Sequence, residues 1–398
     1  MDEPRRRGGT RRNPQSESLS IDRRQFLVMV GGAAAYMALR PTLAVAGKAA
    51  EGLPTLQPWS LPGDPPANPN EVARALIGAA VLAPSHWNAQ PWRFEVEGAS
   101  IRLVADPQRA LPFTDPDRRS MMIGLGAALE NLTIAARAWG LRPQVEYLPF
   151  EGAGGVVARV SWEGGERRRD RAVLAAIPER RTNRRDYDGR AIYPQNRAQL
   201  LAQASGEYAV RWMDDRDAIG VVADLAYEAT RAQERDARIA GEHYAWTRSG
   251  DDDARRRGDG VTVDRFELGG ITQFIAGRSL NPKSWFHRFA PESVAKTVRG
   301  GIRSAAALAL ITAPRGGESS WLMGGQTFQR FALKATELGI AHQPISAPIE
   351  MESARAALLS RFGASGEAPL LLVRLGHAGR PDPSVRRAVA LVASFRNT

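Results

Sequence analysis

The stretch Pro84-Ser85-His86-Trp87-Asn88-Ala89-Gln90-Pro91-Trp92-Arg93-Phe94 joins a predicted helix to a predicted strand. Residues 71–82, before it, are Ala-rich with apolar residues at helical spacing, and apolar residues between 94 and 104 then alternate as in a short hairpin. Pro84 ends the helix and Pro91 fixes the chain as it enters the strand. The small polar groups between the two prolines could point hydrogen-bond partners at a flat ligand. Alternatively, the stretch is a turn whose Trp92 plugs the core.

Composition limits the classes of site that this chain can carry. Its 398 residues suffice for two ordinary domains or one fold made of two halves, and 43% apolar content predicts a packed core. The absence of cysteine excludes disulfides, Cys-ligated zinc, iron–sulfur clusters and a cysteine nucleophile. The five histidines lack metal-ligand spacing, so we expect no metal. The net charge is +11, but the basic residues are dispersed, and we expect no nucleic-acid binding.

Residues 1–46 resemble a twin-arginine signal peptide. Ser20-Ile21-Asp22-Arg23-Arg24-Gln25-Phe26-Leu27 precedes an apolar stretch to Leu39, and Ala44-Val45-Ala46 has the small-x-small pattern of a cleavage site. The resemblance implies the twin-arginine export machinery as a partner and a periplasmic or secreted location. An amphipathic helix or a membrane anchor is the alternative. The apolar run is short and rich in Gly and Ala, so we expect no stable membrane span in the mature chain.

The rest of the chain divides into a linker and two predicted halves. Residues 47–69 are Pro-rich and indicate an extended linker. A first half is predicted at 70–165 and a second at 166–398. Within the second half, residues 247–300 begin with a stretch at 247–260, carrying the charge run Asp251 to Arg257, that predicts a solvated loop. They also include a segment with Trp and Phe that predicts a lid over a site, or else a helical insertion.

Two predicted helices share a pattern across the halves. Residues 126–141 and 325–340 carry apolar residues at matching positions 199 apart. Phe328 and Phe331, for example, stand where Leu129 and Leu132 stand in the first helix. Three positions of the second helix, Gly325, Ala335 and Gly339, are identical to their counterparts. The pattern suggests an internal repeat.

The cluster Arg180-Arg181-Thr182-Asn183-Arg184 is suited to binding phosphate. Guanidinium groups offer forked hydrogen bonds to phosphate oxygens, and the hydroxyl of Thr182 adds another donor. A solvated basic surface is the alternative for a cluster of this kind.

Two later segments have polar groups at the ends of predicted elements. Ala341-His342-Gln343-Pro344-Ile345-Ser346 follows the second repeat helix, and Pro381-Asp382-Pro383-Ser384-Val385-Arg386-Arg387 follows a predicted strand at 370–376. The first segment could be a plain helix-to-strand turn, and the second a frayed basic end.

Together these four segments resemble the nitroreductase family, and the run R-R-T-N-R-R at 180–185 resembles its Acg branch. The resemblance implies an α+β, nitroreductase-like fold with antiparallel-rich sheets flanked by helices. The family's motifs for one flavin site are split between the two halves, and the complementary set is absent. We therefore expect two fused nitroreductase-type halves that form a monomeric pseudo-dimer with one complete site.

The resemblance also implies FMN as the cofactor, with the chemistry at its N5 atom and no catalytic side chain. It places Arg180, Arg181 and Thr182 near the phosphate, Arg184 near N1 and O2 of the ring, and a backbone N–H of Ile345 or Ser346 near N5. The full set of cofactor-binding residues that it implies is Pro84, Ser85, His86, Asn88, Gln90, Arg180, Arg181, Thr182, Arg184, Pro344, Ile345, Ser346, Arg386 and Arg387.

The function implied is an FMN-dependent oxidoreductase. It would pass electrons from NAD(P)H or another donor to a nitroaromatic- or quinone-like acceptor. NAD(P)H is scarce outside the cytoplasm, and the chain has no G-x-G-x-x-G motif of the kind that binds dinucleotides. A non-catalytic flavin-binding or flavin-sequestering protein is therefore the second hypothesis. A third is an ordinary globular binding protein in which the motifs are accidental.

Overall fold

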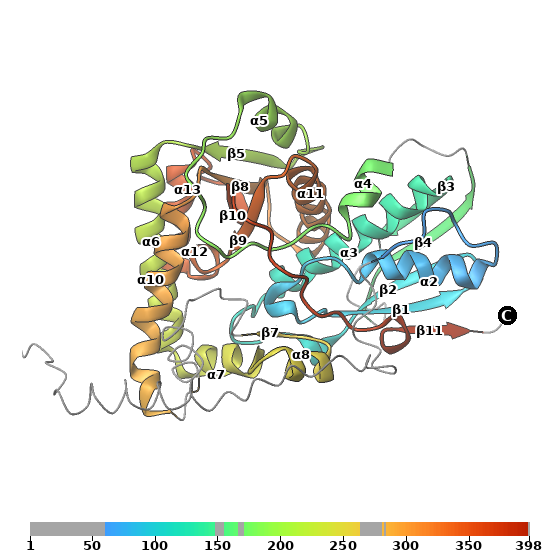
Figure 1. Cartoon of the computed structure of the whole chain (residues 1–398), viewed down its shortest axis with the longest axis horizontal. Helices are drawn as coiled ribbons and strands as arrows, with labels where there is room; N and C mark the ends of the chain where they lie inside the picture. Colours follow the sequence, from blue (N-terminus) through green and yellow to red (C-terminus); the bar gives the residue numbers. More distant parts are fainter. Residues whose placement is uncertain (1–59, 148–154, 166–170, 263–280, 282–283, 397–398) are drawn as a thin grey trace, which may run out of the picture. The chain divides into compact units, whose positions relative to one another are not determined.

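The computed structural model describes residues 60–147, 155–165, 171–262, 281 and 284–396. The predicted signal peptide, most of the predicted linker and residues 263–280 of the predicted lid lie outside these ranges. The described part contains two larger sheets with helices against them (Figure 1). The prediction of an α+β fold with antiparallel-rich sheets flanked by helices is confirmed.

The first sheet has the strand order β11-β1-β2-β4-β3. Its bounds are β1 Trp92–Glu97, β2 Ser100–Ala105, β3 Leu141–Tyr147, β4 Val156–Gly164 and β11 Ala393–Arg396. All neighbours pair antiparallel except β1 and β11, and β1 with β2 forms the predicted hairpin. Strand β11 comes from the end of the chain, so the C-terminal residues return to the sheet of the first half.

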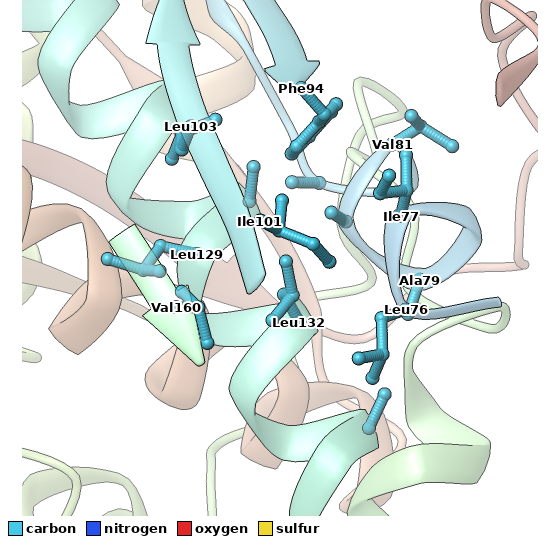
Figure 2. Packing of buried hydrophobic residues seen from close by; sticks show 14 of the residues in the cluster. Leu76, Ile77, Ala79, Val81, Phe94, Ile101, Leu103, Leu129, Leu132 and Val160 are labelled. Atoms are coloured by element: carbon cyan, nitrogen blue, oxygen red, sulfur yellow. The ribbon is translucent and has the colours of Figure 1, made fainter. Parts of the chain in front are cut away.

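Helices α2 (Pro69–Ala80) and α3 (Arg119–Ala138) pack on this sheet because each presents an apolar face. Figure 2 shows Leu76 and Ile77 of α2 against Phe94, Ile101 and Leu132. Asn68 caps α2, since its side chain accepts a hydrogen bond from the backbone N–H of Asn70 at 2.8 Å. The helix ends as predicted before the Pro84–Phe94 stretch.

The second sheet is antiparallel throughout, in the order β5-β8-β10-β9. Its strands are β5 Ala209–Met213, β8 Ala307–Ala313, β9 Ala341–Ile345 and β10 Ala368–Gly376. Alternate residues of β8 enter different cores, and every residue of that strand is buried. One core includes helix α11 (Glu318–Glu337), and the other includes α6 (Arg216–Arg235), α10 (Ala290–Arg303) and α13 (Glu352–Arg361).

Shorter elements connect these layers: α4 Arg171–Ala176, α5 Pro194–Leu201, α7 Ala237–Ala245, α8 Asp251–Arg257 and α12 Ala347–Glu350, with strands β6 Thr247–Arg248 and β7 Val261–Thr262. The prediction of a solvated loop at 247–260 is wrong over its middle, because α8 occupies 251–257. Three aspartates lie in the first turn of α8 and three arginines in the last, the arrangement that the helix dipole favours. None of the helices in the described ranges is long and apolar enough to cross a bilayer.

Helices α3 and α11, which carry the predicted repeat, cross with their backbones in contact (Figure 1). A Cβ atom on Gly126 would lie 1.8 Å from the carbonyl oxygen of Leu322, and one on Gly325 would lie 2.2 Å from that of Ile123. Positions 123 and 126 are each 199 residues before 322 and 325. The two contacts are therefore copies of each other, as in an isologous interface.

Two polar contacts at the same crossing repeat this reciprocity. The side-chain amide of Gln329 donates to the Oδ1 atom of Asn131 at 2.7 Å, and the guanidinium of Arg330 donates to Glu130 at 3.1 Å. Because 130 corresponds to 329 and 131 to 330 at the spacing of 199, one pair is again the copy of the other. This is the pattern expected of two helices related by a two-fold axis.

Replacing Gly126 with Ala should lower the free energy of unfolding by roughly 1–3 kcal/mol or more, because the new methyl group meets a backbone oxygen that cannot move alone. Gly220→Ala in α6 is the matched control, since its Cβ atom would meet nothing within 4 Å. That control should raise stability by about 0.5–1 kcal/mol. Urea denaturation measures both variants, and equal stabilities would contradict the close crossing.

Candidate functional site

The Pro84–Phe94 stretch has a strained backbone. Trp87, Asn88 and Gln90 have φ angles of +50°, +52° and +53°, in the left-handed region that side chains disfavour. Conformations of this kind cost on the order of 1–3 kcal/mol each and persist only where surrounding contacts enforce them.

Two loops of the second half enforce this conformation. The side-chain amide of Asn88 donates to the carbonyl oxygens of Gly260 at 3.0 Å and Val385 at 3.1 Å. The amide of Gln90 donates to the carbonyl oxygen of Gly258 at 2.8 Å and accepts from the backbone N–H of Arg387 at 2.8 Å. The stretch is thus held by residues that lie far from it in the sequence.

These bonds specify the roles of three predicted cofactor-binding residues. The amide of Asn88 is committed to protein partners, since its oxygen also accepts from Arg386 at 2.9 Å. Gln90 and Arg387 are on the linings of neither of the two cavities described below. Arg387 donates to the carbonyl oxygens of Gln90 and Leu391. The structure therefore places Gln90 and Arg387 where they support the stretch.

A small cavity of about 40 Å³ brings together most of the other predicted residues. The first half contributes Pro84, Ser85 and Asn88, and the second contributes the arginine cluster and the segment near the C-terminus. The lining of this cavity consists of Pro84, Ser85, Asn88, Arg180, Arg181, Thr182, Arg184, Val261, Pro381, Asp382, Ser384 and Arg386.

Positive charge is concentrated at this cavity with one carboxylate, Asp382, on the lining. Burial, with repulsion from Arg181 and Arg184, lowers the pKa of Arg180 to about 9. Burial and repulsion from Arg180 and Arg181 hold the pKa of Arg386 well below its usual range. Among the described residues, the Nε and one terminal nitrogen of Arg180 have no hydrogen-bond partner. Buried like charges with spare donors fit an anion such as phosphate.

The arginine loop is held by Arg374, which sequence analysis did not identify as a site residue. This fully buried side chain donates to the carbonyl oxygens of Asn183 and Arg185 and to Gln343, at 3.3, 2.9 and 2.6 Å. Its guanidinium carbon lies 4.1 Å from the centre of the Tyr187 ring. An arginine among the apolar residues of strand β10 was the signal that could have identified it.

A larger cavity of about 240 Å³ adjoins the small one, because Arg184 and Val261 line both. Pro344, Ile345 and Ser346, at the end of β9, line it together with His86. Its other lining residues are Trp87, Thr230, Gln233, Glu234, His243, Ala290, Ser293, Val294, Thr297, Val298, Gly301, Gln343, Ala347 and Arg374. Most of these belong to helices α6, α7 and α10.

Buried charged groups lie near His86, which lines this cavity. Its Nδ1 atom is 3.5 Å from the Oε1 atom of Glu350, and its Nε2 atom is 3.5 Å from the Oγ atom of Ser346. Burial raises the pKa of Asp115, and the nearby carboxylate of Glu350 raises it further. Burial lowers the pKa of Arg119, and the carboxylates of Glu350 and Asp115 partly offset this lowering. Sequence analysis did not identify Glu350, whose proximity to His86 depends on the tertiary fold.

Inorganic phosphate at pH 7 should stabilise the cofactor-free protein against thermal unfolding more than sodium chloride of equal ionic strength. At ten times its Kd, phosphate would contribute roughly 1.4 kcal/mol. Arg180→Met should abolish this gain without loss of basal stability, because it removes a buried cation beside like charges. Arg190→Met, at an exposed position, should keep the gain. Equal melting temperatures of the wild type in the two salts would contradict the anion site.

Comparisons with known proteins bear on this arrangement. No protein-family model matches the chain. The Mycobacterium tuberculosis protein named "Putative NAD(P)H nitroreductase Rv3131" is 27% identical over 334 residues, which cover 82% of this chain and 92% of that protein. The protein named "Putative NAD(P)H nitroreductase acg", from the same organism, is 35% identical over 79 residues, or 20% of this chain and 24% of that protein.

Among solved structures, a nitroreductase with bound FMN from Bacteroides fragilis covers 53% of this chain and 90% of its own, with a TM-score of 0.31 and 15% identity. The resemblance to the nitroreductase family and its Acg branch, predicted from the motifs, is confirmed by relatives that carry these names.

Proposed function

We propose that this chain is an FMN-dependent oxidoreductase that passes electrons from a reductant to a nitroaromatic- or quinone-like acceptor. The observation that carries the proposal is the pair of adjoining cavities that share Arg184. One is small and cationic, and the other is larger and lined mainly by apolar and uncharged residues. A flavin mononucleotide has a matching division into a phosphate and a flat ring. The names of the relatives point to the same chemistry.

The phosphate would be held in the small cavity. Arg180 has buried donors without partners among the described residues, and the side chains of Arg181, Thr182 and Arg386 line the same space. The phosphate charge would offset the mutual repulsion of these guanidinium groups. Held in this way, the cofactor would be fixed at one end.

The ring would lie in the larger cavity, against His86 and the segment Pro344 to Ser346. FMN, when bound, supplies the two-electron chemistry, which the side chains only tune. Arg184 lies where the two cavities meet, and its cation would stabilise negative charge that develops at N1 and O2. A backbone N–H of Ile345 or Ser346 would donate to N5. Arg374 would act indirectly, because it fixes the loop that carries Arg184.

The site would be single and built from two fused nitroreductase-type halves. Two features support this pseudo-dimer: the reciprocal contacts of α3 and α11, and the separate origins of the site residues. The Pro84–Phe94 stretch comes from the first half, and the arginine cluster comes from the second. We therefore propose one FMN per chain.

The names of the relatives support a nicotinamide reductant. Export by the twin-arginine machinery, proposed on Arg23 and Arg24, would leave such a donor scarce. Flavin sequestration is the second candidate function. It is favoured by helix α10, whose Ser293, Thr297 and Val298 line the larger cavity and would lie against a bound ring. Turnover with NAD(P)H and a nitroaromatic compound would distinguish catalysis from sequestration.

Titration of the cofactor-free protein with FMN should reach one equivalent per chain. Arg184→Gln should weaken this binding about 10- to 100-fold, because a hydrogen bond to a charged group contributes roughly 1.5–3 kcal/mol. Arg197→Gln on α5 is the matched control and should bind as the wild type does, since Arg197 lines neither cavity. Isothermal titration calorimetry gives both quantities. Two equivalents per chain, or unchanged affinity of Arg184→Gln, would refute the proposed site.

A further inference from the structure

A histidine and a glutamate at one end of the larger cavity form a buried pair. The Nδ1 atom of His243, on α7, lies 2.8 Å from the Oε1 atom of Glu234 at the end of α6. Both side chains are over 90% buried, and both line the cavity. Because a carboxylate only accepts hydrogen bonds, this contact favours the tautomer with a proton on Nδ1 and leaves Nε2 as the exchangeable position of the ring.

The Nε2 atom of His243 has no hydrogen-bond partner among the described residues. The hydroxyl of Thr230, on the same lining, also has none in that part of the chain. A histidine that merely fills a core would have both nitrogens satisfied or lie away from a cavity. Here two buried polar groups without partners among the described residues belong to side chains that line the cavity.

The position of His243 relative to the first half is fixed. Its ring lies against Trp87, with centroids 4.6 Å apart and an angle of 31° between the planes. The neighbouring Glu242 accepts hydrogen bonds from the backbone N–H and the hydroxyl of Thr114, which ties α7 to the first half. Helix α7 therefore holds the imidazole over the strained stretch that lines the proposed ring site.

We propose that His243 is the proton donor to the electron acceptor and that Glu234 is its positioning residue. This inference rests on the proposed function. A quinone would take a hydride equivalent, that is two electrons and one proton, from the reduced cofactor at one carbonyl oxygen, and a second proton at the other oxygen from Nε2 of the doubly protonated His243 ring. Both C=O π bonds are lost as the ring becomes aromatic, one O–H bond forms on each oxygen, the cofactor is oxidised, and His243, left with its proton on Nδ1, recovers the Nε2 proton from solvent. The site thus selects acceptors whose reduction adds protons to oxygen.

A comparison of two acceptors tests this role. Ferricyanide takes single electrons without protons, whereas 1,4-benzoquinone needs protons as well. The FMN-loaded protein is reduced with dithionite and mixed with each acceptor in a stopped-flow spectrometer. His243→Asn keeps a donor toward Glu234 but lacks Nε2, and Glu234→Gln removes the carboxylate. Both should slow the quinone reaction about 100-fold, as for loss of a general acid, and leave the ferricyanide rate within about twofold.

His377→Gln is the matched control, because His377 lines neither cavity, and it should react with both acceptors at wild-type rates. The FMN content of each variant verifies folding. An unchanged quinone rate in His243→Asn, or an equal loss with both acceptors, would overturn the role of His243 alone. A wild-type protein that reduces ferricyanide but not the quinone would instead overturn the proposed acceptor class.

Binding gives a second measurement that does not depend on turnover. An aromatic ketone that the cofactor does not reduce, 4-hydroxyacetophenone, should bind the oxidised FMN-loaded protein with its carbonyl at His243. His243→Asn should weaken this binding about 2- to 10-fold, as expected for loss of one hydrogen bond, and His377→Gln should not. Equal affinities of the wild type and His243→Asn in calorimetry would contradict the contact.

Discussion

The contact of two helix backbones at Gly126 and Gly325 sets the geometry on which the rest of the site depends. Because no side chain separates them at these positions, α3 and α11 approach closely and can hardly shift along each other. Hydrogen bonds from Gln329 and Arg330 to the facing helix fix the same register. Helix α3 packs mainly in the core of the first sheet and α11 mainly in a core of the second, so the crossing determines where the loops that follow the two sheets meet.

At that meeting place, the structure holds two unfavourable features that support one another. The left-handed backbone at Asn88 is enforced partly by residue 385 and by Arg386, and Arg386 is itself buried beside the cation of Arg180. Backbone strain and like-charge repulsion lower the stability of the ligand-free protein, and ligand binding can offset this cost. A phosphate between the guanidinium groups would remove the repulsion and leave the loop preorganised.

Sequence analysis predicted the local elements well because their signals are local. The helix before Pro84, the hairpin after it and the repeat of 199 residues could all be read from periodicity and proline positions. Gln90 shows what local signals do not reveal. It was predicted to contact the cofactor, whereas its buried amide supports the loop. This role depends on a contact with a residue about 170 positions away in the sequence. The pair of His243 and Glu234 was also missed, because the bend between α6 and α7 brings them together.

The central claim is that one flavin nucleotide bridges the two halves, and a crystal structure of the FMN-loaded protein tests it most directly. The account predicts one FMN per chain, with phosphate oxygens within hydrogen-bond distance of Arg180 and Arg386. It also predicts the ring beside Arg184, against the segment at 344–346. A flavin bound elsewhere, or one whose phosphate points away from these arginines, would contradict the account.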